Sequence, residues 1–147
     1  MQEFIDSYIA RHQSVLAQLA GCASDIEAMA HICITALDRG HKLLICGNGG
    51  SAADAQHMAA ELVGRFIADR PALAAIALTT DTSALTAIAN DYGYEDVFSR
   101  QVAGLARADD VLLAISTSGQ SASVLAACET ARARGCKVLG LSGRDGG

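Results

Sequence analysis

The chain of 147 residues has no tryptophan, a single proline, three tyrosines and three phenylalanines. Hydrophobic residues nevertheless make up 51% of it, which excludes a disordered chain. A chain of this length buries roughly two thirds of its unfolded surface, so it needs no disulfide or metal to hold a core. We therefore expect a single domain over residues 1–147.

Basic residues are not in excess, because the sequence has 11 Lys and Arg compared with 16 Asp and Glu, which gives a net charge of −5. Nucleic-acid binding and basic membrane-surface helices both need clustered positive charge, so we expect no nucleic-acid and no membrane partner. Residues 1–12 carry acids where a signal peptide carries lysines, and no apolar run approaches the roughly 18 residues of a membrane span. These observations predict a cytoplasmic protein.

The sequence also lacks any CxxC motif. Its five cysteines are an odd number and lie far apart, at Cys22, Cys33, Cys46, Cys128 and Cys136. This spacing indicates neither a disulfide framework nor a zinc knuckle. We expect the cysteines to be reduced and buried.

Periodicity divides the chain into a helical segment, residues 1–39, and an alternating core, residues 40–147. Apolar residues at helical spacing predict helices over 4–19 and 26–37, joined near 21–25. Short apolar runs predict strands at 42–46, 74–78, 111–115 and 137–141. Helices are predicted between them at 51–66, 82–89 and 121–134, the last ended by Gly135.

This order predicts an α/β fold, a parallel sheet with helices on both faces, of the flavodoxin or Rossmann kind, after N-terminal helices. The sequence stops directly after a predicted strand, where a loop normally leads into the next helix. We therefore expect a last strand and helix to be absent from this chain. Loops after parallel strands share one edge of the sheet, where ligands bind.

The glycine-rich stretch 46–54 follows the first predicted strand. Its glycines allow the backbone to close around an anion, and Ser51 with Asp54 forms a capping pattern that predicts a helix start. The spacing also satisfies a loose dinucleotide fingerprint, but no acid follows the next strand until Asp81. A P-loop lysine is missing as well. A phosphate or sugar oxygen is the ligand that the stretch favours.

A second loop after the third predicted strand is rich in hydroxyls. Hydroxyl side chains and free backbone amides bind phosphate without a cation. The alternative is an ordinary N-cap turn that uses one serine. The hydroxyl residues are Ser116, Thr117, Ser118 and Ser121.

Two further features have both structural and functional interpretations. His57 and Glu61 stand four residues apart, with Arg65 a turn further on, so the pair faces one way and either binds a metal or merely stabilises a helix. Asp81 is expected to cap the helix predicted over 82–89. Asn90, in the turn expected to end that helix, tolerates a left-handed backbone, and a binding role there is equally open.

Together these stretches resemble the sugar isomerase (SIS) domain family and, within it, the phosphoheptose isomerases. The likeness covers nearly the whole chain, and a set of motifs in this order and spacing is highly specific. The segments that carry it are CGNGGSAADAQHMAAELVGRF (46–66), RPALAAIALTTDTSALTAIANDYGYEDVFSRQV (70–102), DVLLAISTSGQSASVL (110–125) and LGLSGRDGG (139–147).

The resemblance implies a five-stranded parallel sheet and a homotetramer with active sites between subunits, assembled through the N-terminal helices. It implies one zinc ion per subunit, held in part by His57 and Glu61, with Glu61 also the catalytic acid/base residue. The remaining ligands and a second acid/base group, a glutamine and a histidine, are implied in a terminal helix that this chain lacks. The implied substrate-binding residues are Asn48, Gly49, Gly50, Ser51, Glu61, Asn90, Asp91, Ser116, Thr117, Ser118 and Ser121.

The implied reaction converts sedoheptulose 7-phosphate to D-glycero-D-manno-heptose 7-phosphate through an enediol, the first step toward ADP-heptose and the heptose of lipopolysaccharide. The alternative is a non-catalytic SIS module that binds a sugar phosphate or a partner protein, as in the branch associated with replication initiators. Such a module needs no His57–Glu61 pair. Another phosphosugar as substrate is a third possibility.

Overall fold

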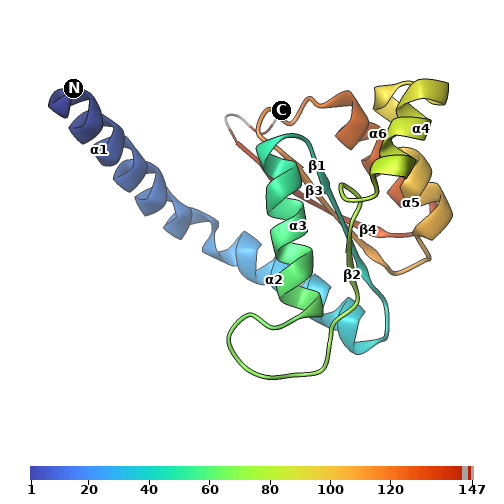
Figure 1. Cartoon of the computed structure of the whole chain (residues 1–147). Helices are drawn as coiled ribbons and strands as arrows, with labels where there is room; N and C mark the ends of the chain where they lie inside the picture. Colours follow the sequence, from blue (N-terminus) through green and yellow to red (C-terminus); the bar gives the residue numbers. More distant parts are fainter. Residues whose placement is uncertain (144–145, 147) are drawn as a thin grey trace. The chain divides into compact units, whose positions relative to one another are not determined.

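The computed structural model describes residues 1–143 and 146 (Figure 1). Arg144, Asp145 and Gly147, at the end of the fourth segment that carries the family resemblance, lie outside the described residues. The chain divides into two compact units, Met1–Ile32 and Cys33–Gly147, and the division falls within one helix. No helix in the described part is long and apolar enough to cross a membrane.

The first unit consists of helices, as the apolar spacing predicted. These are α1 (Gln2–Gln18), the 3-10 helix η1 (Leu19–Cys22) and most of α2 (Ala23–Asp38). None of the residues of α1, all of which the structure describes, is buried. The exposed apolar side chains of α1 and η1 are Phe4, Ile5, Tyr8, Ile9, Val15, Leu16 and Leu19.

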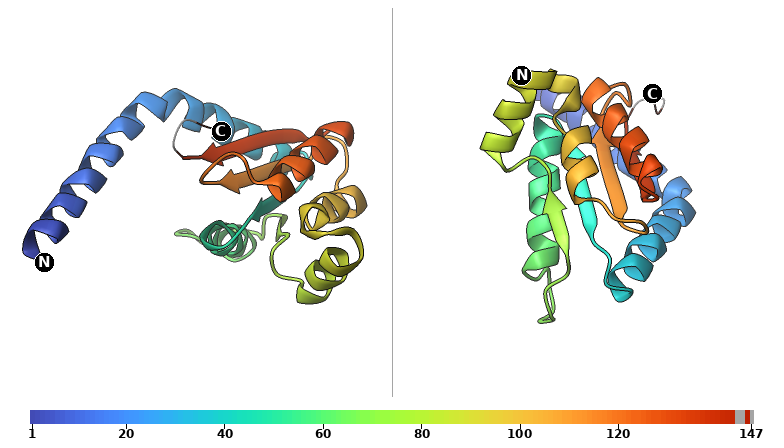
Figure 2. Two further views of the ribbon diagram at one scale, coloured as in Figure 1. Left: turned by 90° about the horizontal axis from the view of Figure 1, so that it is seen from above. Right: turned by 90° about the vertical axis from the view of Figure 1, so that its right-hand side faces the viewer.

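The second unit is built on a parallel sheet with the strand order β2-β1-β3-β4. The arrows run side by side in one direction in Figures 1 and 2. The strands are β1 (Leu43–Gly47), β2 (Ala75–Ala77), β3 (Val111–Ser116) and β4 (Lys137–Ser142). All four coincide with the predicted strands to within one residue at each end, and the parallel α/β fold is confirmed.

Helices cover both faces of this sheet. On one face, Leu44 and Leu112 belong to a buried cluster with residues of α5 and α6 and with Val97 and Phe98, which lie between η2 and α5. The alternate residues Leu43 and Ile45 point to the opposite face, along which α3 runs with Ala55 and Ala59 buried. The connecting helices are α3 (Gly50–Val63), α4 (Thr82–Tyr92), η2 (Tyr94–Asp96), α5 (Ser99–Leu105) and α6 (Ala122–Ala133).

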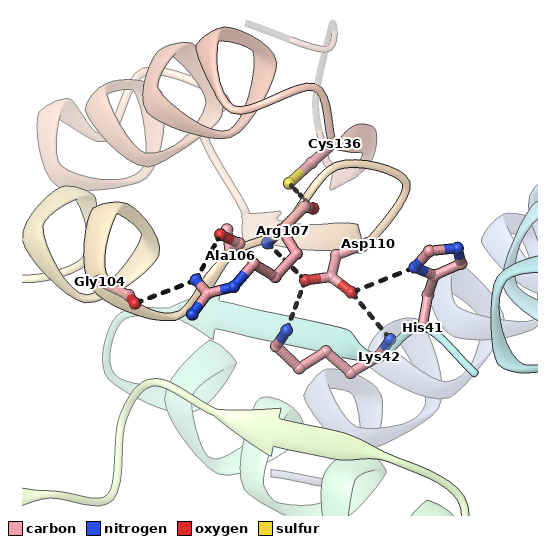
Figure 3. Close-up of polar contacts among 7 residues, drawn as sticks. All are labelled: His41, Lys42, Gly104, Ala106, Arg107, Asp110 and Cys136. Atoms are coloured by element: carbon pink, nitrogen blue, oxygen red, sulfur yellow. Dashed lines mark hydrogen bonds and ion pairs between the residues drawn. The ribbon is translucent and has the colours of Figure 1, made fainter.

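A buried carboxylate fastens the amino-terminal edge of the sheet (Figure 3). Asp110 is 1% exposed, and its Oδ1 accepts from the backbone N–H of Lys42 at 3.0 Å. Its Oδ2 accepts from Lys42 Nζ at 2.5 Å and from the backbone N–H of Arg107 at 2.7 Å, while His41 Nδ1 lies 3.9 Å from Oδ1. Burial alone raises the pKa of Asp110, but these hydrogen bonds outweigh it and the pKa is lowered.

The prediction that Gly135 ends the helix α6 is confirmed. Gly135 has a φ of +78°, in the left-handed region that favours glycine. Its N–H donates to the carbonyl of Arg132 at 3.0 Å, and the N–H of Cys136 donates to the carbonyl of Ala131 at 2.9 Å. This pair of bonds is a Schellman motif, which satisfies the last carbonyls of the helix.

Three local predictions are wrong. The capping pattern of Ser51 with Asp54 does not start α3, because Gly49 occupies the N-cap position and Ser51 lies in the first turn. The same helix ends at Val63 rather than at residue 66, so Arg65 is not on it. Asn90 does not turn the chain, since α4 continues to Tyr92 and Gly93 takes the positive φ of 98°.

The cysteine prediction holds only in part. All five cysteines are free, and Cys46 and Cys136 are buried, but Cys22 is exposed on η1. Burial, and secondarily the neighbouring Cys128, raises the pKa of Cys46 to about 12. A thiol with so high a pKa does not form the nucleophilic thiolate at neutral pH.

Candidate active site

A cavity of about 220 Å³ opens at the carboxyl ends of β1 and β3. These strands are neighbours in register, with Gly47 opposite Ile115, so the loops that follow them meet at one edge of the sheet. The cavity is lined by Asn48, Ser51, Ile115, Ser116, Thr117, Ser118 and Ser121. The structure therefore brings together six of the side chains that the sequence analysis selected.

The turn from β1 into α3 forms one wall and depends on glycine. A Cβ on Gly47 would lie 2.7 Å from Ser51 Cβ and 2.9 Å from the carbonyl oxygen of Ile115, closer than side chains approach. Gly49, the N-cap of α3, has a φ of +56°. The first turn of α3 consequently sits directly on the two strands, with the amides of the helix start beside the cavity.

The loop from β3 into α6 forms the other wall. Gly119, with a φ of +69°, donates its N–H to both the carbonyl and the Oγ of Ser116 at 3.1 Å. Ser118 Oγ accepts from the N–H of Gln120 at 3.2 Å. Ser121 is the N-cap residue of α6 but makes no side-chain capping bond. An N-cap turn served by Ser121 therefore does not explain this loop.

Asn48 joins the two walls through its side-chain amide. Its Nδ2 donates to Ser121 Oγ at 2.9 Å and to Ser123 Oγ at 3.0 Å. Its Oδ1 accepts from the hydroxyl of Tyr94 at 2.8 Å. Asn48 is thus held by three groups from two helical segments, η2 and the start of α6.

His57 and Glu61 lie on one side of α3, as their spacing predicted. His57 Nε2 is 3.2 Å from Glu61 Oε1, and their side chains are 75% and 34% exposed. Two ligand atoms about 2.0 to 2.1 Å from a tetrahedral zinc ion lie about 3.3 Å apart, so the pair fits two positions of such an ion. Within the described residues, no group of three or more His, Cys, Asp or Glu could complete the site.

The structure does not bring this pair to the cavity of the same chain. Glu61 follows Ser51 by ten residues of α3, which at 1.5 Å per residue is about 15 Å along the helix axis. Gly49 and Gly50 lie at the cavity end of the helix. Asn90 and Asp91 lie in the last turn of α4, exposed, with Asn90 Nδ2 donating to Asp91 Oδ1 at 2.8 Å, and do not line the cavity.

Two residues that contact the site were missed by the sequence analysis. Tyr94 belongs to a short 3-10 helix with no periodicity to mark it. Arg70 lies in the loop after α3, where its Nη2 donates to the carbonyl of Glu61 at 2.7 Å and its Nη1 to the carbonyl of Leu62 at 2.9 Å. The guanidinium thereby satisfies carbonyls at the end of the helix that carries Glu61. No pattern in the sequence marks either contact.

The parallel sheet with a hydroxyl-lined cavity at its carboxyl edge defines the class of protein. The SIS domain family matches residues 7–143, and the chain belongs to this family. It is 56% identical to the phosphoheptose isomerase of Nitratiruptor sp. and 52% identical to that of Akkermansia muciniphila. The alignments cover all of this chain and 79% and 78% of those relatives.

Solved structures agree with this assignment. The phosphoheptose isomerase GmhA of Neisseria gonorrhoeae matches with a TM-score of 0.93 and 48% identity, over 99% of this chain and 77% of that one. A phosphoheptose isomerase of Francisella tularensis matches with a TM-score of 0.96 and 39% identity, with the same coverage. The family and the fold predicted from the motifs are therefore confirmed.

Proposed function

We propose that this protein is a phosphosugar isomerase that converts sedoheptulose 7-phosphate to D-glycero-D-manno-heptose 7-phosphate. The observation that carries the proposal is the hydroxyl-lined cavity between two helix N-termini, in a chain more than half identical to phosphoheptose isomerases. By the family resemblance, the product supplies the heptose of lipopolysaccharide, and the reaction takes place in the cytoplasm.

The phosphate end of the substrate is proposed to occupy the cavity. A phosphate group only accepts hydrogen bonds when fully ionised, and the walls offer hydroxyls and helix-start amides as donors. Ser116, Thr117, Ser118 and Ser121 are the proposed phosphate residues, with Ser51 opposite them. The helix dipoles of α3 and α6 favour the negative charge without a lysine or arginine.

Asn48, Gly49, Gly50, Asn90 and Asp91 are proposed to contact the sugar. Asn48 lines the cavity, and the two glycines begin the helix beside it. Asn90 and Asp91 are exposed on α4, where they are accessible to a sugar or to another subunit.

Glu61 is proposed to take a proton from C1 of the ketose and a second acid/base group to deliver one to C2, while the hydroxyl proton of O1 passes to O2, so that the carbonyl moves from C2 to C1 through an enediol. His57 and Glu61 are proposed to hold a zinc ion, which when bound would polarise the neighbouring sugar oxygens. A catalytic zinc usually has three protein ligands. The resemblance assigns the others, and the second acid/base group, to a glutamine and a histidine of a terminal helix.

The proposed active form is a homotetramer with active sites between subunits. The separation of about 15 Å along α3 supports this, because it leaves Glu61 outside the cavity of its own chain. The exposed apolar side chains of α1 also support assembly, since contiguous exposed apolar surface marks contact sites.

The test is an isomerase assay with sedoheptulose 7-phosphate on the full product of the gene, with and without zinc. Glu61→Gln removes the proton acceptor while keeping the shape, and we expect kcat to fall by about 10²- to 10⁴-fold. Glu27→Gln is a matched control, because Glu27 also lies four residues from a histidine on a helix, 3.8 Å from His31. Retained turnover in Glu61→Gln would remove Glu61 from the mechanism.

Binding of the sugar phosphate without turnover by the wild-type protein would instead favour a non-catalytic SIS module. Turnover of a different phosphosugar in preference to the heptulose would correct the substrate and leave the site intact. Zinc content of the wild type and of His57→Ala, measured on the same preparations, tests the metal separately from the activity.

A further inference from the structure

Tyr94 is linked to the cavity through Asn48. Its hydroxyl donates to Asn48 Oδ1 at 2.8 Å, and it is not among the residues that line the cavity. A phenol is a better donor than an aliphatic hydroxyl, because the ring delocalises the oxygen lone pair. Tyr94 therefore favours the amide orientation in which Oδ1 faces η2 and Nδ2 faces α6.

This orientation determines which hydrogen bonds Ser121 has left to make. Asn48 Nδ2 donates to two serine oxygens, Ser121 Oγ at 2.9 Å and Ser123 Oγ at 3.0 Å. A hydroxyl has one proton and two lone pairs, so Ser121 has accepted one bond and keeps its proton to donate. The neighbouring Ser123 Oγ is 3.4 Å away, longer than the usual O–H···O range of about 2.5 to 3.0 Å.

We propose that Tyr94 is a positioning residue for phosphate recognition: by fixing the Asn48 amide, its hydroxyl leaves Ser121 as a hydrogen-bond donor toward the ligand. A fully ionised phosphate oxygen only accepts, so this donor matches it. With the amide turned over, Ser121 would donate to Asn48 Oδ1 and present a lone pair to the phosphate. The inference rests on the proposed function, because it takes the cavity to be the phosphate site.

Ser123 strengthens the argument because it is 3% exposed and cannot exchange its partners for water. Its oxygen accepts from Asn48, so its own proton is available to Ser121 and not to the amide. When both serines accept from Asn48, the hydrogen bonds run in one direction, from Tyr94 and Asn48 toward the cavity. Loss of the Tyr94 hydroxyl removes the group that sets this direction.

The experiment compares Tyr94→Phe with Tyr92→Phe in the full product of the gene. Both variants remove one phenolic hydroxyl from an exposed tyrosine of the same segment. Tyr92 is a suitable control because its ring contact with Arg100, at 3.7 Å, survives the change. The two readouts are the Kd for inorganic phosphate, measured by titration without turnover, and the KM and kcat for sedoheptulose 7-phosphate.

We expect Tyr94→Phe to weaken phosphate binding and raise KM about fivefold, the loss of about one hydrogen bond, with kcat within about twofold. Tyr92→Phe should change neither value. An unchanged phosphate Kd in Tyr94→Phe, or an equal loss in Tyr92→Phe, overturns the inference. A fall in kcat at constant KM also overturns it, because a general disturbance of the fold or of the acid/base group would produce that pattern.

The phosphate titration separates this inference from the isomerase proposal. If the wild type binds phosphate but does not isomerise the sugar, the proposed function fails and the Kd comparison still decides the role of Tyr94. If the wild type isomerises and Tyr94→Phe binds phosphate unchanged, the inference alone fails. If the wild type does not bind phosphate, this inference fails, and the isomerase assay still decides the proposed function.

Discussion

Polar groups at the two edges of the sheet differ in how many hydrogen bonds they have left to make. At the amino-terminal edge, the carboxylate of Asp110 receives three hydrogen bonds and is 1% exposed. At the carboxyl-terminal edge, the hydroxyls of Ser116, Thr117 and Ser121 line a cavity open to a ligand. The carboxylate of the first arrangement is buried against its donors and fastens strands, whereas the second arrangement retains donors for binding. The number of unused hydrogen-bond donors, more than polarity, distinguishes a candidate binding site from a structural cluster.

The largest effect on stability is expected from Asp110→Asn. The substitution removes the negative charge and places an NH₂ donor beside the N–H donors of Lys42 and Arg107, and two donors form no hydrogen bond. The free energy of unfolding should therefore fall by about 3 kcal/mol. Asp109→Asn is the matched control, because this neighbour is exposed. Urea unfolding measures both, and phosphate affinity should stay unchanged. A loss of phosphate affinity in folded Asp110→Asn would contradict the assignment of structural and binding roles to different edges of the sheet.

The same carboxylate predicts a pH dependence of stability. Because the pKa of Asp110 is lowered in the folded state, its contribution is complete above the unfolded value of about 3.9 and is lost as the pH falls toward the folded value. The difference in unfolding free energy between wild type and Asp110→Asn should therefore be constant from about pH 7 to 5 and shrink below about pH 4. A constant difference down to pH 3 would contradict a lowered pKa.

The smallest effect is expected at the open edge, from Thr117→Val. The substitution keeps the shape and removes one exposed hydroxyl of the cavity. Phosphate affinity should fall about fivefold, the value of one hydrogen bond, while the melting temperature stays within about 1 °C. Phosphate titration and thermal unfolding together test this. Lowered stability with unchanged affinity would show that Thr117 serves the fold.

The elements that the sequence predicted are those with a strong local signal. The four strands are short apolar runs, and Gly135 ends α6 because only a residue that tolerates a positive φ fits there. The hydroxyl cavity followed from the rule that loops after parallel strands share an edge. Local information was sufficient in these places.

The rest depends on contacts between residues distant in sequence. Asp110 binds Lys42, 68 residues away, and Tyr94 binds Asn48, 46 residues away, so no local pattern marks either. The helix α5 has seven residues, too few for a periodic signal, and is held by the burial of Val102. The start of α3 was misjudged because the tight contact at Gly47, rather than a serine cap, sets it. That the cavity and the His57–Glu61 pair belong to one active site stays a prediction.

The close contact at Gly47 has a further consequence for the energetics of binding. Because Gly47 leaves no room between β1, the first turn of α3 and the end of β3, the walls of the cavity are fixed by the same packing that holds the sheet. The conformational entropy of ordering these loops is then lost when the chain folds and not when the ligand arrives. Such preorganisation favours tight capture of a small anion by neutral donors alone.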